Sequence, residues 1–137
     1  MAQYMLMVYQ DHVDPPVQAE REKVTPTMLE LHRSLREAGL LVEVKRLRSV
    51  ESATSVRVGS GETEITDGPF AVTKEVLAGY YILECADLDE ALKHAEQLPS
   101  ARYGTIEVRP VLSPDEWADI VREAGVDVPD EAVEYLA

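Results

Sequence analysis

Apolar and polar positions follow two different periods along this chain, and their order predicts two strand–helix–strand units. Short apolar runs that end in polar residues are typical of buried strands. Apolar residues at helical spacing between capping residues indicate helices. The predicted strands cover residues 4–9, 41–47, 54–58, 62–66, 80–85 and 105–111, and the predicted helices cover 26–38, 88–98 and 114–124.

The first predicted helix has clear boundaries. Thr25 is a suitable N-cap, Pro26 suits the first helical position, and Gly39 suits the C-terminal stop. His32 lies at the flank of the apolar stripe of this helix, which fits either a histidine packed beside the core or a titratable group facing a cleft. The preceding residues 10–24 contain two consecutive prolines and are predicted to form a loop with a short helical turn.

The order of these elements predicts an α+β fold, a ferredoxin-like sandwich with both long helices on one face of the sheet. The opposite face of that sheet still carries apolar side chains. A second copy of the chain would cover them, so we expect a homodimer. Residues 1–112 are assigned to this domain, and residues 113–137 to an acidic helical extension of it.

The formal net charge of −13 excludes several classes of partner. Acidic residues number 26 against 13 basic ones, and such a surface repels nucleic-acid phosphates and anionic membranes. The extension is the most acidic part, with a net charge of −7 over residues 113–137, which we interpret as a solvated face. The first residues do not resemble a leader, and no stretch is apolar enough to span a bilayer, so we expect a cytoplasmic protein.

Metal ions and cofactors are not expected from the sequence. Cys85 is the single cysteine, which excludes an intrachain disulfide and a multi-thiolate metal site, and its apolar strand favours a buried, inert thiol. Asp11, His12 and Asp14 are close in sequence, but a proline-rich loop with one histidine is more typical of solvated side chains. Nucleotide, flavin and haem motifs are absent from the sequence.

One stretch, DGPFAVTKE at residues 67–75, connects the two halves of the chain. Its Gly68–Pro69 pair favours a turn, because proline fixes its own φ and restricts the residue before it. Followed by Gly-Tyr-Tyr at residues 79–81, the stretch resembles the signature of the DGPF family, a branch of the YCII-related proteins. Blocks at residues 54–57, 89–92 and 104–111 resemble the family pattern in the same order.

The resemblance implies a dimeric α/β barrel and leaves the activity open. The YCII-related group contains a dehalogenating lyase-type activity, and DGPF proteins resemble partners of extracytoplasmic-function sigma factors. Asp67, Lys74 and Glu75 match the family motif. Family members typically carry an acidic residue where this chain has Val72. If that carboxylate is a general base in the relatives, this chain lacks it, which argues against the same acid–base mechanism here.

Five residues are candidates for a small-molecule site if the central loop folds over the sheet. Arg57 and Arg109 occupy positions that alternate with apolar residues in two predicted strands. Together with Lys74 they are candidates for holding a substrate carboxylate or phenolate. Asp67 and Glu75 are the candidates for moving a proton as catalytic residues.

The two arginines also have a purely structural explanation. Inside a barrel, Arg57 and Arg109 would need carboxylate partners, and Asp67, Glu75 or Glu107 could supply them. Three functions therefore remain open. They are proton transfer on a small organic acid or phenol as a lyase or isomerase, a non-catalytic accessory role beside a sigma factor, and a structural dimer module.

Overall fold

The computed structural model describes all 137 residues and contains a four-stranded antiparallel sheet with strand order β2-β5-β1-β6. The strands are β1 (Ala2–Asp11), β2 (Leu41–Arg46), β5 (Glu75–Cys85) and β6 (Gly104–Pro110). The first strand lies between β5 and β6 and pairs with both. Two helices follow β1 and connect it to β2 at the edge of the sheet, so β5 lies between the two strands of the first unit.

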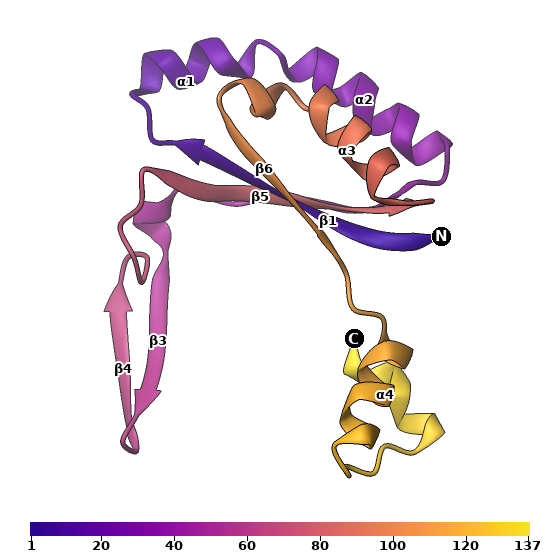
Figure 1. Cartoon of the computed structure of the whole chain (residues 1–137). Coiled ribbons are helices and arrows are strands. Elements are labelled where there is room, and N and C mark those ends of the chain that lie inside the picture. Colours follow the sequence, from indigo (N-terminus) through magenta and orange to yellow (C-terminus); the bar gives the residue numbers. More distant parts are fainter.

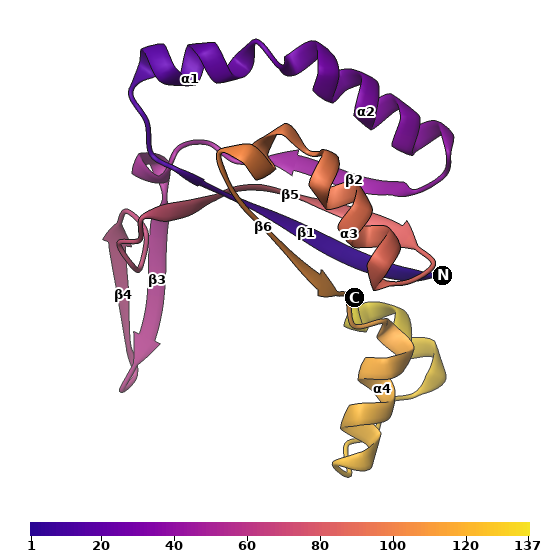
Figure 2. The ribbon, with the colours of Figure 1, turned by 45° about the horizontal axis from the view of Figure 1, so that its top comes forward.

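Helices cover one face of this sheet (Figures 1 and 2). They are α1 (Pro15–Glu22), α2 (Thr25–Glu37) and α3 (Leu88–Gln97), followed by the short 3-10 helix η2 (Pro99–Arg102). Leu6, Leu83 and Cys85 are the largest fully buried side chains of the core between sheet and helices. Leu35 and Ala91 contribute the helical side of that core.

The predicted α+β class is confirmed. Within one protomer the sheet is open, with β2 and β6 as its edges, so a single chain forms no closed barrel. The predicted caps of the two later helices are also present. Asp87 accepts a hydrogen bond from the Glu90 backbone N–H at 2.9 Å, and Ser113 Oγ accepts one from the Glu116 N–H at 3.1 Å.

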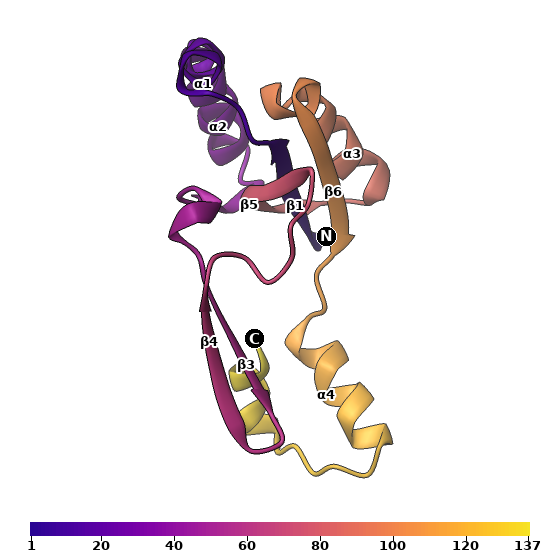
Figure 3. The ribbon, with the colours of Figure 1, turned by 90° about the vertical axis from the view of Figure 1, so that its left-hand side faces the viewer.

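Two segments project from the sheet on the side away from the helices (Figures 1 and 3). One is the hairpin of β3 (Thr54–Gly59) and β4 (Glu62–Asp67), which follows the 3-10 helix η1 (Val50–Ser52) and forms its own two-stranded sheet. The other is α4 (Pro114–Glu123) with the 3-10 helix η3 (Asp130–Leu136). In these two segments only Ala118 is buried.

Three local predictions differ from the structure. Residues 15–22 form an α-helix instead of a loop. The two prolines occupy the first positions of this helix, where backbone N–H groups have no partner within the helix, so the N–H groups that proline lacks are not missed. Thr25 does not cap α2, since its hydroxyl donates to the Glu22 carbonyl oxygen. Strand β5 starts at Glu75, five residues earlier than predicted. None of the helices is both long enough and apolar enough to cross a membrane.

Candidate functional site

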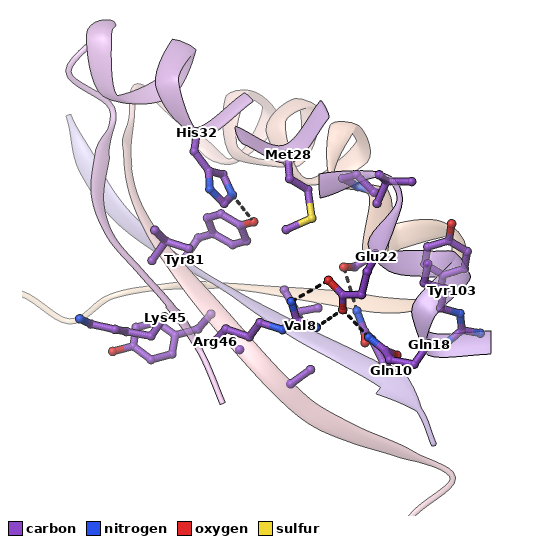
Figure 4. Close-up of a pocket in the computed structure, with 18 residues that line it drawn as sticks. Val8, Gln10, Gln18, Glu22, Met28, His32, Lys45, Arg46, Tyr81 and Tyr103 are labelled. Carbon is purple, nitrogen blue, oxygen red and sulfur yellow. Dashed lines mark hydrogen bonds and ion pairs between the residues drawn. The ribbon is translucent and has the colours of Figure 1, made fainter. Parts of the chain in front are cut away.

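A cavity of about 170 Å³ lies between the helices α1 and α2 and the sheet (Figure 4). Its walls come from β1, β2 and β5 below, α1 and α2 above, and η2 on one side. The lining residues are Val8, Gln10, Gln18, Arg21, Glu22, Val24, Met28, His32, Val44, Lys45, Arg46, Ala78, Gly79, Tyr80, Tyr81, Pro99, Ser100 and Tyr103. Most of the exposed surface inside the cavity is apolar.

A histidine–tyrosine pair lines one part of this cavity (Figure 4). His32 Nε2 of α2 lies 2.7 Å from the Tyr81 hydroxyl oxygen of β5, and the two rings meet edge to face with centroids 5.2 Å apart. Tyr81 faces the helices because alternate residues of a strand share one face, and Leu83 and Cys85 are buried on that same face.

Burial keeps both members of the pair neutral. Removal from water lowers the pKa of His32, and the nearby positive charge of Arg36 lowers it further. Burial also raises the pKa of Tyr81, which is only 5% exposed. At neutral pH the pair is therefore an uncharged imidazole beside a protonated phenol, which is an arrangement able to accept a proton at histidine.

A charged group occupies another part of the cavity wall. Arg46 of β2 makes a two-point ion pair with Glu22 of α1, with one of its contacts, from Nη1 to Oε2, at 3.1 Å. Gln18 donates a further hydrogen bond to the Glu22 carboxylate. The hydrogen bonds from Arg46 lower the pKa of Glu22, so this carboxylate stays ionised at neutral pH.

The side wall near η2 is held by Arg21 of α1. Its guanidinium lies 4.6 Å from the centre of the Tyr103 ring, and its Nη1 donates to Asp11 at 3.0 Å. Across the same wall Gln10 donates a hydrogen bond to Ser100 Oγ at 2.9 Å. These contacts connect β1, α1 and η2, so the cavity is built on ordered elements.

The structure places Arg57, Asp67 and Lys74 away from this cavity. Arg57 lies on β3 opposite Glu64, and Asp67 ends β4 opposite Thr54. Lys74 lies in the loop that connects the hairpin to β5. All three side chains belong to exposed residues.

Glu75 and Arg109 lie on the face of the sheet that the helices leave open. Glu75 accepts a hydrogen bond from Thr105 Oγ1 at 3.0 Å, and Arg109 Nε donates to Glu107 at 2.7 Å. The pairing of Arg109 with Glu107 matches the structural explanation of that arginine. Within one protomer no hydrogen bond or ion pair joins any two of the five predicted site residues, and their roles remain predictions.

The acidic loop near the first strand does not gather metal ligands. Asp11 pairs with Arg21, and His12 Nε2 lies 3.4 Å from a carboxylate oxygen of Glu51. Asp14 is the residue before α1 and makes no capping hydrogen bond through its side chain.

Comparison with known proteins identifies the family. A family model described as the YCII-related domain matches residues 2–117. The chain belongs to the YCII-related family. An uncharacterised protein of Rhizobium meliloti (strain 1021) is 45% identical over 94 residues, which cover 67% of this chain and 76% of that protein. The match to the family therefore includes the whole four-stranded sheet, the cavity and the start of α4.

Sequence reasoning left the roles of His32 and Tyr81 open, although both carried a signal. His32 sits one position after Leu31, at the flank of the apolar stripe, where a side chain points along the groove between helix and sheet. Tyr81 alternates with Leu83 and Cys85, so it shares the helix-covered face. The contact between the two side chains could not be predicted, because it depends on how α2 is placed over β5.

We expect the stability of the protein to fall when the pH is lowered from about 6.5 toward the lowered pKa of His32. In that range the unfolded chain binds a proton at His32 more readily than the folded chain, so protonation favours unfolding, and above it the contribution is fully present. Urea unfolding at pH 7.5 and 5.5 will measure the loss.

The variant His32→Gln should lose less stability than wild type over this range. An identical pH dependence in His32→Gln and wild type would contradict the assignment.

Proposed function

We propose that this YCII-related protein binds a small phenol or organic acid in the cavity under α1 and α2. The observation that carries the proposal is the 2.7 Å contact between His32 and Tyr81 inside a mostly apolar cavity. Ligand sites are typically apolar pockets with a few convergent polar groups, some with a perturbed pKa.

The size of the cavity favours a ligand with a single ring. Its volume is about 170 Å³. An apolar cavity of about 150 Å³ in another protein holds benzene. Val8, Met28 and Val44 would contact the ring, and the polar group of the ligand would meet the His32–Tyr81 pair.

The chemistry that this pair supports is proton transfer from the ligand. The Tyr81 hydroxyl donates its proton to His32 Nε2 and takes the acidic proton of the ligand, so the tyrosine ends neutral and the imidazole ends protonated. An anion formed in this way can expel a leaving group or move a double bond. The proposed activity is accordingly that of a lyase or isomerase.

A thermal-shift screen of single-ring phenols and small carboxylic acids will test binding. A ligand at a hundred times its dissociation constant stabilises a protein by about 2.7 kcal/mol, which gives a clear shift. For a ligand found in this way we expect Tyr81→Phe and His32→Gln to weaken binding about tenfold each, because the first removes the hydroxyl group and the second removes the imidazole that pairs with it. Proton exchange of the bound ligand in heavy water, followed by NMR, will report catalysis.

Matched variants decide where the ligand binds. His12→Gln changes an exposed histidine outside the cavity and should leave binding unchanged. A ligand that is lost in Asp67→Asn but retained in His32→Gln and Tyr81→Phe would place the site at the 67–75 loop and contradict the cavity proposal.

The alternative function is that of a non-catalytic accessory protein that contacts a sigma factor. The projecting segment of α4 and η3 favours it, because residues 113–137 carry a net charge of −7 while Trp117 and Ile120 of α4 stay about half exposed. Such a surface suits a basic partner with apolar contacts. Binding of a ligand without proton exchange would favour this alternative.

We also infer that two copies pair through the open face of the sheet. The hairpin and α4 project from that face at two separate places (Figures 1 and 2). Val56, Val58 and Ile65 of the hairpin are 66–69% exposed, and a two-stranded hairpin with so little burial is marginal alone. A partner sheet packed here would complete the dimeric α/β barrel that the sequence predicts.

The dimer would also change the surroundings of two predicted site residues. Glu75 and the Arg109–Glu107 pair lie on the open face, so a partner sheet would enclose them. The prediction that these residues form one site therefore depends on the dimer.

A further inference from the structure

A cysteine, a glutamate and a histidine meet where the end of β5 passes under the start of α3. Cys85 is the last residue of β5, and Glu90 and His94 lie four residues apart on α3. Residues at this spacing share one face of a helix. One ligand atom from each of the three side chains lies within 4.8 Å of the others.

The helix cap fixes the glutamate of this cluster. The Glu90 backbone N–H donates to Asp87 at 2.9 Å, and in return the Ala86 backbone N–H donates to Glu90 Oε2 at 2.7 Å. This reciprocal bonding leaves the second carboxylate oxygen, Oε1, turned toward His94, with 3.7 Å to its Nε2. The carboxylate is therefore oriented before any ligand arrives.

The histidine of the cluster lacks a hydrogen-bond partner. Both ring nitrogens of His94 are buried, and neither forms a hydrogen bond. Buried polar atoms are nearly always paired, because leaving one unpaired costs free energy. Cys85 is completely buried, and its sulfur lies within 4.8 Å of ligand atoms of both Glu90 and His94.

We propose that Cys85, Glu90 and His94 bind a zinc ion. Thiolate sulfur, imidazole nitrogen and carboxylate oxygen are the three kinds of ligand that zinc takes in proteins, whereas magnesium and calcium prefer oxygen ligands alone. Three protein ligands leave a fourth tetrahedral position for water or a small anion. None of the three residues lines the cavity of the proposed phenol site, so this site is independent of that function.

The ion would connect the central sheet to α3. Cys85 belongs to the interior strand β5, and the other two ligands belong to the helix that covers it. Zinc would satisfy one buried nitrogen of His94 and replace the thiol proton of Cys85. Sequence reasoning favoured an inert thiol at Cys85 because its two partners become visible only when α3 is placed over the strand end.

Calorimetric titration of zinc chloride into the full-length, chelator-treated protein tests the proposal. We expect one zinc ion per chain. The dissociation constant should rise at least about tenfold in His94→Gln and in Glu90→Gln. Cobalt(II) should give a near-ultraviolet thiolate charge-transfer band with wild type, and the band should disappear in Cys85→Ala.

The control is His12→Gln, which removes a histidine from a different part of the surface and should bind zinc like wild type. Circular dichroism will establish that each variant is folded. If Cys85→Ala does not fold, the two helix variants decide, because Glu90 and His94 are partly exposed and tolerate substitution better. Zinc binding that is weak and not stoichiometric, or unchanged in His94→Gln and Glu90→Gln, would overturn the proposal.

Discussion

Replacing Gly104 with alanine will destabilise the protein by about 3 kcal/mol, because the first residue of β6 lies directly against the backbone of β1. A Cβ atom at this position would be 1.9 Å from the Tyr9 carbonyl oxygen and 2.9 Å from the Tyr9 carbonyl carbon. These are main-chain atoms of the central strand, so they cannot rotate away as a flexible side chain would. The cost appears as a lower midpoint in urea unfolding.

Gly59→Ala provides the matched control for Gly104→Ala. Gly59 also lies in a strand, its added Cβ would meet nothing within 4 Å, and its backbone does not have the positive φ that favours glycine. We expect a change of about 0.5 kcal/mol or less in Gly59→Ala. Equal stability of Gly104→Ala and wild type would show that β6 does not pair with β1 in this register.

Replacing Ile65 with glutamate will dissociate the inferred dimer. Ile65 is 69% exposed on the projecting hairpin, where a partner copy would cover it. A charge enclosed without a partner in such an interface costs about 2 kcal/mol or more, which corresponds to roughly thirtyfold weaker association. Sedimentation velocity over a range of protein concentrations will measure the dissociation constant of each variant.

Leu29→Glu is the control for this prediction. Leu29 is 59% exposed, but it lies on α2, in the layer on the opposite side of the sheet. Its replacement should leave association unchanged. A wild-type protein that is monomeric at every concentration, or a Leu29→Glu variant that dissociates as much as Ile65→Glu, would contradict the inferred interface.

Local patterns were sufficient to predict most of the fold. The capping residues Asp87 and Ser113 both form the predicted hydrogen bonds, because such caps depend only on residues three positions apart. Short apolar runs at residues 4–9 and 80–85 predicted the buried strands β1 and β5, and Leu6 and Leu83 are indeed almost fully enclosed. The α-helix at residues 15–22 was not predicted, because two consecutive prolines usually indicate a loop. Prolines are also compatible with the first turn of a helix, but the sequence alone did not show that a helix starts there.

The candidate sites depend on contacts that a linear pattern does not contain. His32 and Tyr81 are 49 residues apart in sequence, and their meeting follows from the position of α2 over β5. Val72, where the chain departs from the family motif, is 99% exposed in the loop, so its side chain is not packed against the rest of the protomer. The five predicted site residues have the right kinds of side chain, but they are distributed over a projecting hairpin, the loop that follows it and an open sheet face.

The central place of β1 has a consequence for how the chain folds during synthesis. Met7 lies opposite Tyr80 on one side and opposite Glu107 on the other, so β1 is synthesised well before both of the strands with which it pairs. Until then, α1 and α2 have no sheet on which to bury their apolar sides. Assembly of the sheet is thus a late, cooperative event governed by long-range contacts, which favours slow folding and an extended need for protection of the nascent chain from aggregation.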